Sequence, residues 1–402
     1  ASEPVNYISA RSESLAGMLY LGGLVSFSVG HRLGRAAFKY VSWICLLAGL
    51  LTKSSVITLP AALLLFDGIF LHRVRSKWSL REAVSRHGVY WLIASVYLLS
   101  IILNRFLTTS LANRVRSMDE QLLTQVKALA YYGKLLVWPY GLNVEHQFLV
   151  SDSADGAVLL PLLALVALGM ALFGFYRKRM RVLLFSCLWG LLSLIPVLIM
   201  PLNVLVNERR LYLPAAAFCI GLAYFLERSS LRGYSLPIGG GVMVVFALLT
   251  FQRNTDWKDD FTLWKDALEK ASHMPRAHLY MGNAHKDAAF KAVAGSSEAL
   301  GHWNQARGAF HRAIELQPRG DLALRALNNL GAVSFVLQDI KGAEQAYRRA
   351  VELNPTFADA LINLGTIYHE RGRRADSEAG RLLLEQSVSY YKRALQQLPN
   401  HA

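Results

Sequence analysis

Basic and acidic side chains beside apolar segments are the residues of this chain that could carry chemistry. The stretch NERRLYLP places Glu208, Arg209 and Tyr212 directly before an apolar run. Arginine binds phosphate oxygens through forked hydrogen bonds, and a carboxylate can accept the proton of a hydroxyl group. Charged groups near membrane depth tend to be functional because burying them is costly. We therefore interpret this stretch as one wall of a phosphate-binding cleft, with an ordinary solvated loop as the alternative.

Further stretches offer groups of the same kind. The N-terminal stretch EPVNYISARSE contains Glu3 and Arg11, WPYGLNVEHQF contains Glu145 and His146, and Lys53 separates two apolar runs. If these stretches lie on one face of a helical bundle, they form a cleft where a lipid-phosphate donor could meet a hydroxyl-bearing acceptor.

These residues have separate predicted roles. Arg11 and Arg209 are candidates for binding the donor phosphate, with Lys53 as a weaker one, and Glu208 and His146 would orient those groups or the acceptor. The spacing of His, Cys, Asp and Glu in the sequence predicts no metal site, and it contains no phosphate loop or Ser-His-Asp arrangement.

The elements that must position these groups belong to two regions of the chain, one expected in lipid and one expected in water. The chain has 402 residues, of which 53% are hydrophobic and 18% charged, against about 25% charged in ordinary soluble domains. Apolar runs dominate up to residue 251, and charges are frequent beyond it. The net charge of +15 comes mainly from short loops between apolar runs, which is typical of membrane topology, so no nucleic-acid partner is expected.

The first region, residues 1–251, is predicted to be a polytopic bundle of about eight transmembrane helices. A helix needs about 20 residues to cross the hydrocarbon core. The candidate spans are residues 14–30, 40–53, 55–71, 88–104, 157–176, 182–202, 211–227 and 235–251.

The distribution of Lys and Arg predicts the orientation of this bundle. Fourteen of them lie in four short loops, at 31–39, 72–87, 177–181 and 228–234. The positive-inside rule places these loops in the cytoplasm. It therefore places the 105–156 loop and the C-terminal region on the other side, periplasmic in a bacterium or lumenal in a eukaryote.

The long 105–156 loop is predicted to contain a helix in the membrane interface. In residues 121–138, Leu122, Leu129 and Leu136 share one stripe, and Lys127 lies on another, where it would be near lipid phosphates. The alternative is a ninth span, which would invert everything downstream.

The second region, residues 276–402, repeats a 34-residue pattern typical of tetratricopeptide (TPR) repeats. Gly331 recurs as Gly365, and Tyr347 and Pro355 follow Gly331 at the expected places. Three repeats are predicted, with more beyond Ala402, and they would form a concave surface for a protein partner. Residues 252–275 are predicted to be an amphipathic junction helix.

The same motifs resemble the transmembrane-and-TPR O-mannosyltransferase family. Ser54 departs from the family pattern, which has Glu there, and together with the short TPR insertions it indicates a bacterial homologue. The matching residues are Glu3, Arg11, Lys53, Pro60, Glu208, Arg209, Leu211, Tyr212 and Pro214.

The resemblance implies an all-α fold, with a GT-C-like membrane bundle followed by a TPR solenoid. It implies a polyprenyl- or dolichyl-phosphate sugar donor, with mannose as the sugar, and exported acceptor proteins bound by the TPR array. It also places the acidic catalytic residue upstream of Ala1, so this chain is expected to be a fragment whose catalytic residue is unknown. Two alternatives stay open: a non-catalytic TPR scaffold for envelope proteins, and an O-antigen-ligase-like oligosaccharide transferase.

Overall fold

The computed structural model describes residues 11–71, 80–104, 116–199, 204–375 and 378–397, and all secondary structure in these ranges is helical. The chain forms two compact units. The first comprises Ala1–Leu142 and Phe148–Thr255, and the second comprises Asn143–Gln147 and Asp256–Ala402. The first unit is a bundle of apolar helices and the second carries TPR helix pairs, which confirms the predicted fold class.

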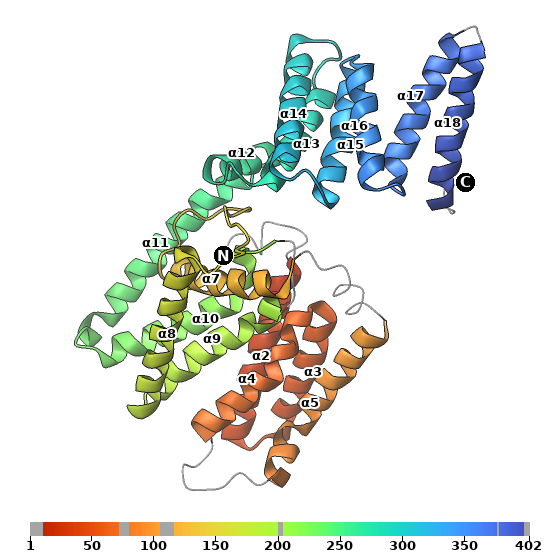
Figure 1. The fold of residues 1–402 in the computed structure, drawn as a ribbon. Coiled ribbons are helices and arrows are strands. Elements are labelled where there is room, and N and C mark those ends of the chain that lie inside the picture. Colours follow the sequence, from red (N-terminus) through yellow and green to blue (C-terminus); the bar gives the residue numbers. More distant parts are fainter. Residues whose placement is uncertain (1–10, 72–79, 105–115, 200–203, 376–377, 398–402) are drawn as a thin grey trace. The chain divides into compact units, whose positions relative to one another are not determined.

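The first unit consists of apolar helices, as Figure 1 shows. Seven of its helical segments in the described ranges are long and apolar enough to cross a membrane, and the shorter α3 is also apolar. Each predicted span corresponds to one of these segments. The elements are α2 (Arg11–Leu33), α3 (Ala36–Thr52), α4 (Leu59–Phe66) between η2 (Ser54–Thr58) and η3 (Asp67–Leu71), α5 (Leu80–Leu103), α8 (Gly156–Arg177), α9 (Arg181–Ile199), α10 (Tyr212–Arg228) after η4 (Glu208–Leu211), and α11 (Ser235–Asp256) after η5 (Arg232–Tyr234).

These helices expose side chains that a soluble protein would bury. Leu51 is 79% exposed and Leu236 is 87% exposed, and α8 has little buried surface. Water would make such exposure unfavourable, whereas lipid tails solvate it. The first unit therefore has the features of the membrane-spanning part of a multi-pass membrane protein.

Small residues let the membrane helices approach one another closely. A Cβ atom on Gly23 of α2 would lie 2.8 Å from the Leu59 side chain of α4, and one on Gly49 would lie 2.8 Å from that of Val56. Close backbone approach of this kind gives dispersion contacts that lipid tails cannot replace. The rings of Tyr20 and Trp189 stack in the resulting core with centroids 6.3 Å apart.

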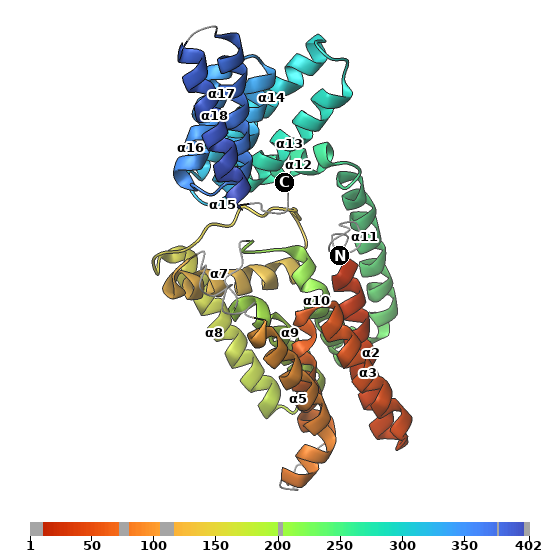
Figure 2. The same ribbon diagram turned by 90° about the vertical axis from the view of Figure 1, so that its right-hand side faces the viewer.

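Helix α7 (Met118–Val137) is not among the helices apolar enough to span a membrane. Ser117 begins it with a capping box to Glu120, and Figures 1 and 2 show it lying across the ends of α8, α9 and α10. Its buried face includes Ala128 and Tyr132, which belong to neither stripe expected from the sequence, and Thr124, which belongs to the stripe of Lys127.

The second unit is built from α12 and three helix pairs. In each pair, a glycine of the first helix lies against an aromatic ring of the second, and a Cβ atom there would come 2.5–2.7 Å from that ring. The pairs are Gly282 with Phe310, Gly331 with Tyr347, and Gly365 with Tyr391. The helices are α12 (Asp260–Lys270), α13 (Pro275–Lys291), α14 (Ser297–Leu316), α15 (Asp321–Val336), α16 (Ile340–Leu353), α17 (Ala358–Arg374) and α18 (Glu378–Gln397).

The junction differs from the single amphipathic helix predicted over residues 252–275. Helix α11 continues to Asp256, and α12 begins separately at Asp260. The break occurs because Asp259 is extended and its carboxylate accepts the backbone N–H of Thr262 at 2.7 Å, which starts a new helix. Trp264 of α12 then stacks on Tyr280 of α13, with centroids 4.5 Å apart.

A short piece of the connection between α7 and α8 belongs to the second unit. Val144 packs in a cluster with Trp264 and Ala267, and the side-chain amide of Asn143 donates to the backbone oxygen of Ala267 at 3.3 Å. The sequence division placed the whole 105–156 loop in the membrane region, whereas these contacts assign residues 143–147 to the second unit.

Candidate functional site

One end of the first unit contains a small polar cavity where three of the predicted site residues meet. Its volume is about 40 Å³, and α2, η2, α9 and the start of α10 enclose it. Arg209 and Tyr212 line the cavity, and Lys53 is ion-paired with Glu13, which also lines it. The other polar residues in its wall are Ser55, Ser193 and Arg210.

The turn before α10 places the two arginines. Asn207 is extended, and its side-chain oxygen accepts the backbone N–H of Arg209 at 3.0 Å, which starts the short helix η4. Helix α10 follows directly, so Tyr212 lies one turn further along the same wall. The Tyr212 ring lies against Gly17 of α2, where a Cβ atom would overlap it. This glycine therefore gives the ring its place beside the cavity.

Arg210 holds the turn in position. Its guanidinium donates to the backbone oxygens of Val204 and Leu205, both at 2.8 Å, and to the Tyr132 hydroxyl at 3.2 Å. The same hydroxyl accepts the backbone N–H of Asn207 at 3.2 Å. Several bonds from one planar group fix the backbone that carries Arg209. Sequence reasoning gave Arg210 no role, because the pattern ERRL does not show which arginine points toward the protein.

Lys53 and Glu13 join two segments of the bundle. Lys53 is extended between α3 and η2, and its ammonium group contacts the Glu13 carboxylate of α2. The Glu13 side chain is only 14% exposed. The ammonium group of Lys53 offsets the cost of taking this carboxylate out of water. Glu13 belongs to the N-terminal stretch EPVNYISARSE that the sequence offered as part of a cleft, but the sequence contains no signal that pairs residues 40 positions apart.

Glu208 lies at the buried side of the turn. Its side chain is 9% exposed, and its charge adds to burial in raising the pKa of Tyr131. Glu208 is not one of the described residues that line the cavity. Its predicted role beside the phosphate therefore stays a prediction that this geometry does not favour.

Lys127 has a structural role in the α7–α8 connection. Its ammonium group donates to the Leu149 backbone oxygen and the Ser151 hydroxyl, both at 2.7 Å, and lies 4.9 Å from the Phe148 ring centre. Burial lowers the pKa of Lys127. These contacts hold the α7–α8 connection against α7. The sequence analysis had instead expected Lys127 to lie near lipid phosphates.

The remaining predicted residues are not part of this cavity. His146 is 4% exposed and belongs to the second unit with Glu145. Glu3 and the side chain of Arg11 lie outside the described residues. Within the described ranges, His, Cys, Asp and Glu form no group of three that could hold a metal ion.

An apolar groove lies beside the polar cavity in the same unit. Its volume is about 410 Å³, and side chains of α7, α8, α9 and α10 line it. Adjacent residues belong to the two spaces: Ser193 lines the cavity and Leu194 the groove, while Leu213 lines the cavity and Pro214 the groove. The two spaces therefore share α9 and α10 as walls. A molecule with an apolar chain and a charged head fits such a pair of spaces.

The second unit offers a different kind of surface. A cavity of about 340 Å³ lies among α14, α15 and α16, with Leu327 and Leu330 as apolar lining and Arg307 and Arg349 as basic lining. Separately, asparagine amides connect the first helices of successive repeats. Asn329 donates to Asn283 at 2.9 Å, and Asn363 donates to Asn328 at 3.0 Å.

Comparison with known proteins relates both units to named families. A model described as a TPR repeat matches residues 331–372. The protein O-mannosyl-transferase Tmtc3 of Drosophila melanogaster is 29% identical over 231 residues, which are 55% of this chain and 23% of the fly protein. Human protein O-mannosyl-transferase TMTC3 is 28% identical over 43% of this chain and 18% of its own length. The resemblance inferred from the sequence motifs is thereby confirmed.

A second group of relatives matches only a smaller part of the chain. The photosystem I assembly protein Ycf3 of Rippkaea orientalis (strain PCC 8801 / RF-1) is 28% identical over 110 residues, which are 26% of this chain and 64% of Ycf3. The chain spans less than a quarter of the length of the fly and human O-mannosyl-transferases. TPR repeats are protein-interaction modules, so a protein partner fits the second unit.

Proposed function

We propose that this chain is the membrane and first TPR part of a glycosyltransferase that uses a polyprenyl- or dolichyl-phosphate sugar to modify hydroxyl groups of exported proteins. The observation that carries the proposal is the polar cavity lined by Arg209 and Glu13, with Lys53 paired to Glu13, beside the apolar groove. The similarity to protein O-mannosyl-transferases supports it. Mannose is the sugar that this similarity favours.

In this proposal, the groove of α7–α10 accepts the isoprenoid chain. An apolar wall removes that chain from water and orients the molecule, and the phosphate then reaches the shared end of α9 and α10. Arg209 binds phosphate oxygens, with Tyr212 beside it in the cavity wall. Lys53 pairs with Glu13 and so offsets the negative charge that this carboxylate brings to the cavity wall.

Arginine at the phosphate would also favour breakage of the sugar–phosphate bond. The leaving phosphate gains negative charge as that bond breaks, and a fixed guanidinium stabilises this charge. The acceptor hydroxyl attacks the sugar carbon and loses its proton to a carboxylate. That carboxylate is not assigned to a residue of this chain.

The TPR unit would hold the acceptor protein. The Lys and Arg distribution of the sequence favours the non-cytoplasmic side for this unit, which is the side where exported proteins are found. The mixed apolar and basic cavity among α14, α15 and α16 is a candidate contact for such a protein.

A membrane-anchored TPR scaffold is the second candidate function. The similarity of the repeat region to an assembly protein, Ycf3, is the observation that favours it. A scaffold would recruit envelope proteins through the same repeats without using the polar cavity.

Binding and transfer of the sugar separate the two functions. The purified chain in nanodiscs is titrated with radiolabelled polyprenyl-phosphate-mannose, and Arg209→Gln is compared with Arg228→Gln, which removes the same charge outside the cavity wall. Binding that only Arg209→Gln weakens, followed by mannose transfer from the full-length protein, supports the transferase. Equal, weak binding by all three proteins would leave the scaffold as the better account.

A further inference from the structure

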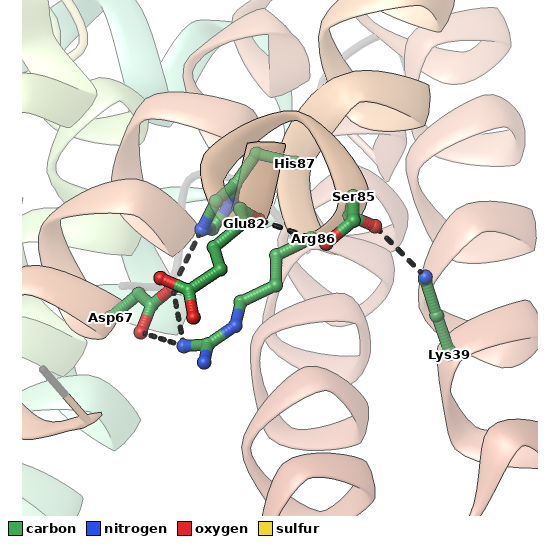
Figure 3. Close-up of polar contacts among 6 residues, drawn as sticks. All are labelled: Lys39, Asp67, Glu82, Ser85, Arg86 and His87. Carbon is green, nitrogen blue, oxygen red and sulfur yellow. Dashed lines mark hydrogen bonds and ion pairs between the residues drawn. The ribbon is translucent and has the colours of Figure 1, made fainter. Parts of the chain in front are cut away.

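A second charged cluster lies at the other end of the same helices. Helix α4 ends in a π-helical turn that begins at Asp67, and this turn directs the carboxylate toward α5 (Figure 3). The carboxylate accepts from Arg86 at 3.0 Å and contacts the His87 ring nitrogen at 2.9 Å. Asp67 is 1% exposed. The buried carboxylate therefore fixes the guanidinium group of Arg86.

Arg86 lines a cavity of about 230 Å³ whose other charged lining residues are also basic. His31 comes from the last turn of α2, Arg35 from the connection between α2 and α3, and Lys39 from the first turn of α3. Lys39 donates to the backbone oxygen of Ser85 at 3.2 Å, which joins α3 to α5 (Figure 3). The lining also includes Phe27, Gly30, Gly34 and Ala36.

Positive charge exceeds negative charge around this cavity. Asp67 is already engaged by Arg86 and His87, and Glu82 is the exposed acid beside them (Figure 3). Arg35 and Lys39 remain as cations that line the space from a different side than Asp67. Helix α3 also begins at Ala36 with no side-chain cap, so its first backbone N–H groups add to the positive potential.

The cavity lies at the end of α2 opposite the polar cavity of Arg209, at a separation that suits the other leaflet of a membrane. Helix α2 runs from Glu13, in that cavity, to His31, in this one. Eighteen helical steps of 1.5 Å separate them by about 27 Å, which is close to the thickness of a hydrocarbon core. Leu33 and Tyr40, which are 54% and 56% exposed, flank the basic residues with lipid-facing apolar surface.

We propose that this cavity binds the phosphate of an anionic phospholipid headgroup. Arg35, Lys39 and Arg86 surround the phosphate oxygens, and the neighbouring exposed apolar side chains contact the acyl chains. The site would anchor α2, α3 and α5 to one leaflet. It does not depend on the sugar-transfer proposal, because the two cavities lie at opposite ends of the bundle.

The test measures phospholipid binding with a charge-matched control. The purified protein is titrated in detergent with phosphatidylglycerol and with phosphatidylcholine, and bound lipid is counted by native mass spectrometry. Arg35→Gln and Lys39→Gln are each expected to weaken phosphatidylglycerol binding about fivefold. Arg32→Gln removes a charge from the last turn of α2, next to His31 in the chain, but Arg32 does not line the cavity. It is expected to change binding less than about twofold.

The other outcomes overturn the proposal. Equal weakening by Arg32→Gln would mean that diffuse charge attracts the lipid and no site exists. Equal affinity for the two lipids would exclude a site that selects an anionic headgroup, because phosphatidylcholine carries the same phosphate with no net charge. Inorganic phosphate serves as a soluble competitor, and if it binds as tightly as phosphatidylglycerol, the cavity is a site for a free anion. Normal thermal unfolding of each variant confirms that lost binding is not lost folding.

Discussion

The carboxylate of Glu145 lies 3.3 Å from the guanidinium of Arg276, although 131 positions separate them in the chain. This ion pair ties the connection after α7 to the first helix of the TPR pairs, within the second unit. Asn143 adds a hydrogen bond to Ala267. The α7–α8 connection is therefore a structural part of the TPR unit as well as a loop of the membrane unit.

Burial makes the Glu145 attachment pH-dependent. Burial raises the pKa of Glu145, and the charges of Arg276 and His146 oppose that rise only in part. Because the folded state binds the proton more tightly, Glu145 contributes most to stability below its unfolded pKa, and this contribution is lost as pH rises through its folded pKa. We expect Glu145→Gln to remove this pH dependence from the thermal unfolding of the TPR unit, followed by tryptophan fluorescence.

Arg276→Gln supplies the control for that measurement. Removing the cation leaves the buried carboxylate without its attraction, so the loss of stability on raising the pH should become steeper and extend to higher pH. The raised pKa of Glu145 would be contradicted if the unfolding temperature of the unmodified protein rose with pH over this range. The same measurement on Glu145→Gln would then have to show no change with pH, so that the rise belongs to Glu145.

Gly331 and Gly308 differ in what a side chain would meet. A Cβ atom on Gly331 would lie 2.5 Å from the Tyr347 ring, whereas one on Gly308 has open space. Gly331→Ala should therefore destabilise the TPR unit by about 1–3 kcal/mol. Gly308→Ala, on an exposed face of α14, should stabilise it by about 0.5–1 kcal/mol because alanine favours helix. Urea unfolding measures both, and equal effects would argue against this repeat packing.

Neighbouring arginines of the turn before α10 should give opposite phenotypes. Arg210→Gln loses the bonds to Val204, Leu205 and Tyr132, so it should lower stability by about 1–3 kcal/mol. Arg209→Gln should leave the unfolding temperature nearly unchanged and weaken lipid-phosphate binding about tenfold or more. Thermal unfolding in detergent and a lipid-binding assay are measured on the same samples. A stability loss confined to Arg209→Gln would reverse these roles.

The ion pair of Lys53 and Glu13 should show energetic coupling. Both side chains are partly exposed, at 29% and 14%, so solvent screens their attraction and a coupling of about 1 kcal/mol is expected. A double-mutant cycle with Lys53→Gln and Glu13→Gln, followed by detergent unfolding, measures it. Strict additivity of the two substitutions would mean that the pair contributes nothing to joining α2 and α3.

The sequence predicted the membrane spans and the TPR repeats because both patterns are local. Continuous apolar length reports a helix in lipid, and Gly331, Gly365 and Tyr347 recur at fixed spacing because paired helices must approach closely. The motif before α10 likewise indicated Arg209 and Tyr212, since consecutive residues of one turn remain together in any fold.

The tertiary structure decided the partners. Glu13 meets Lys53, Arg210 holds its turn through Tyr132, and Lys127 holds the loop at Ser151. His146 belongs to the second unit, whereas Lys53 and Arg209 belong to the first. The sequence does not show which residue a charged side chain will contact, because its partner comes from a distant segment that only helix packing brings close. Packing alone, in the same way, placed Arg35, Lys39 and Arg86 around one cavity.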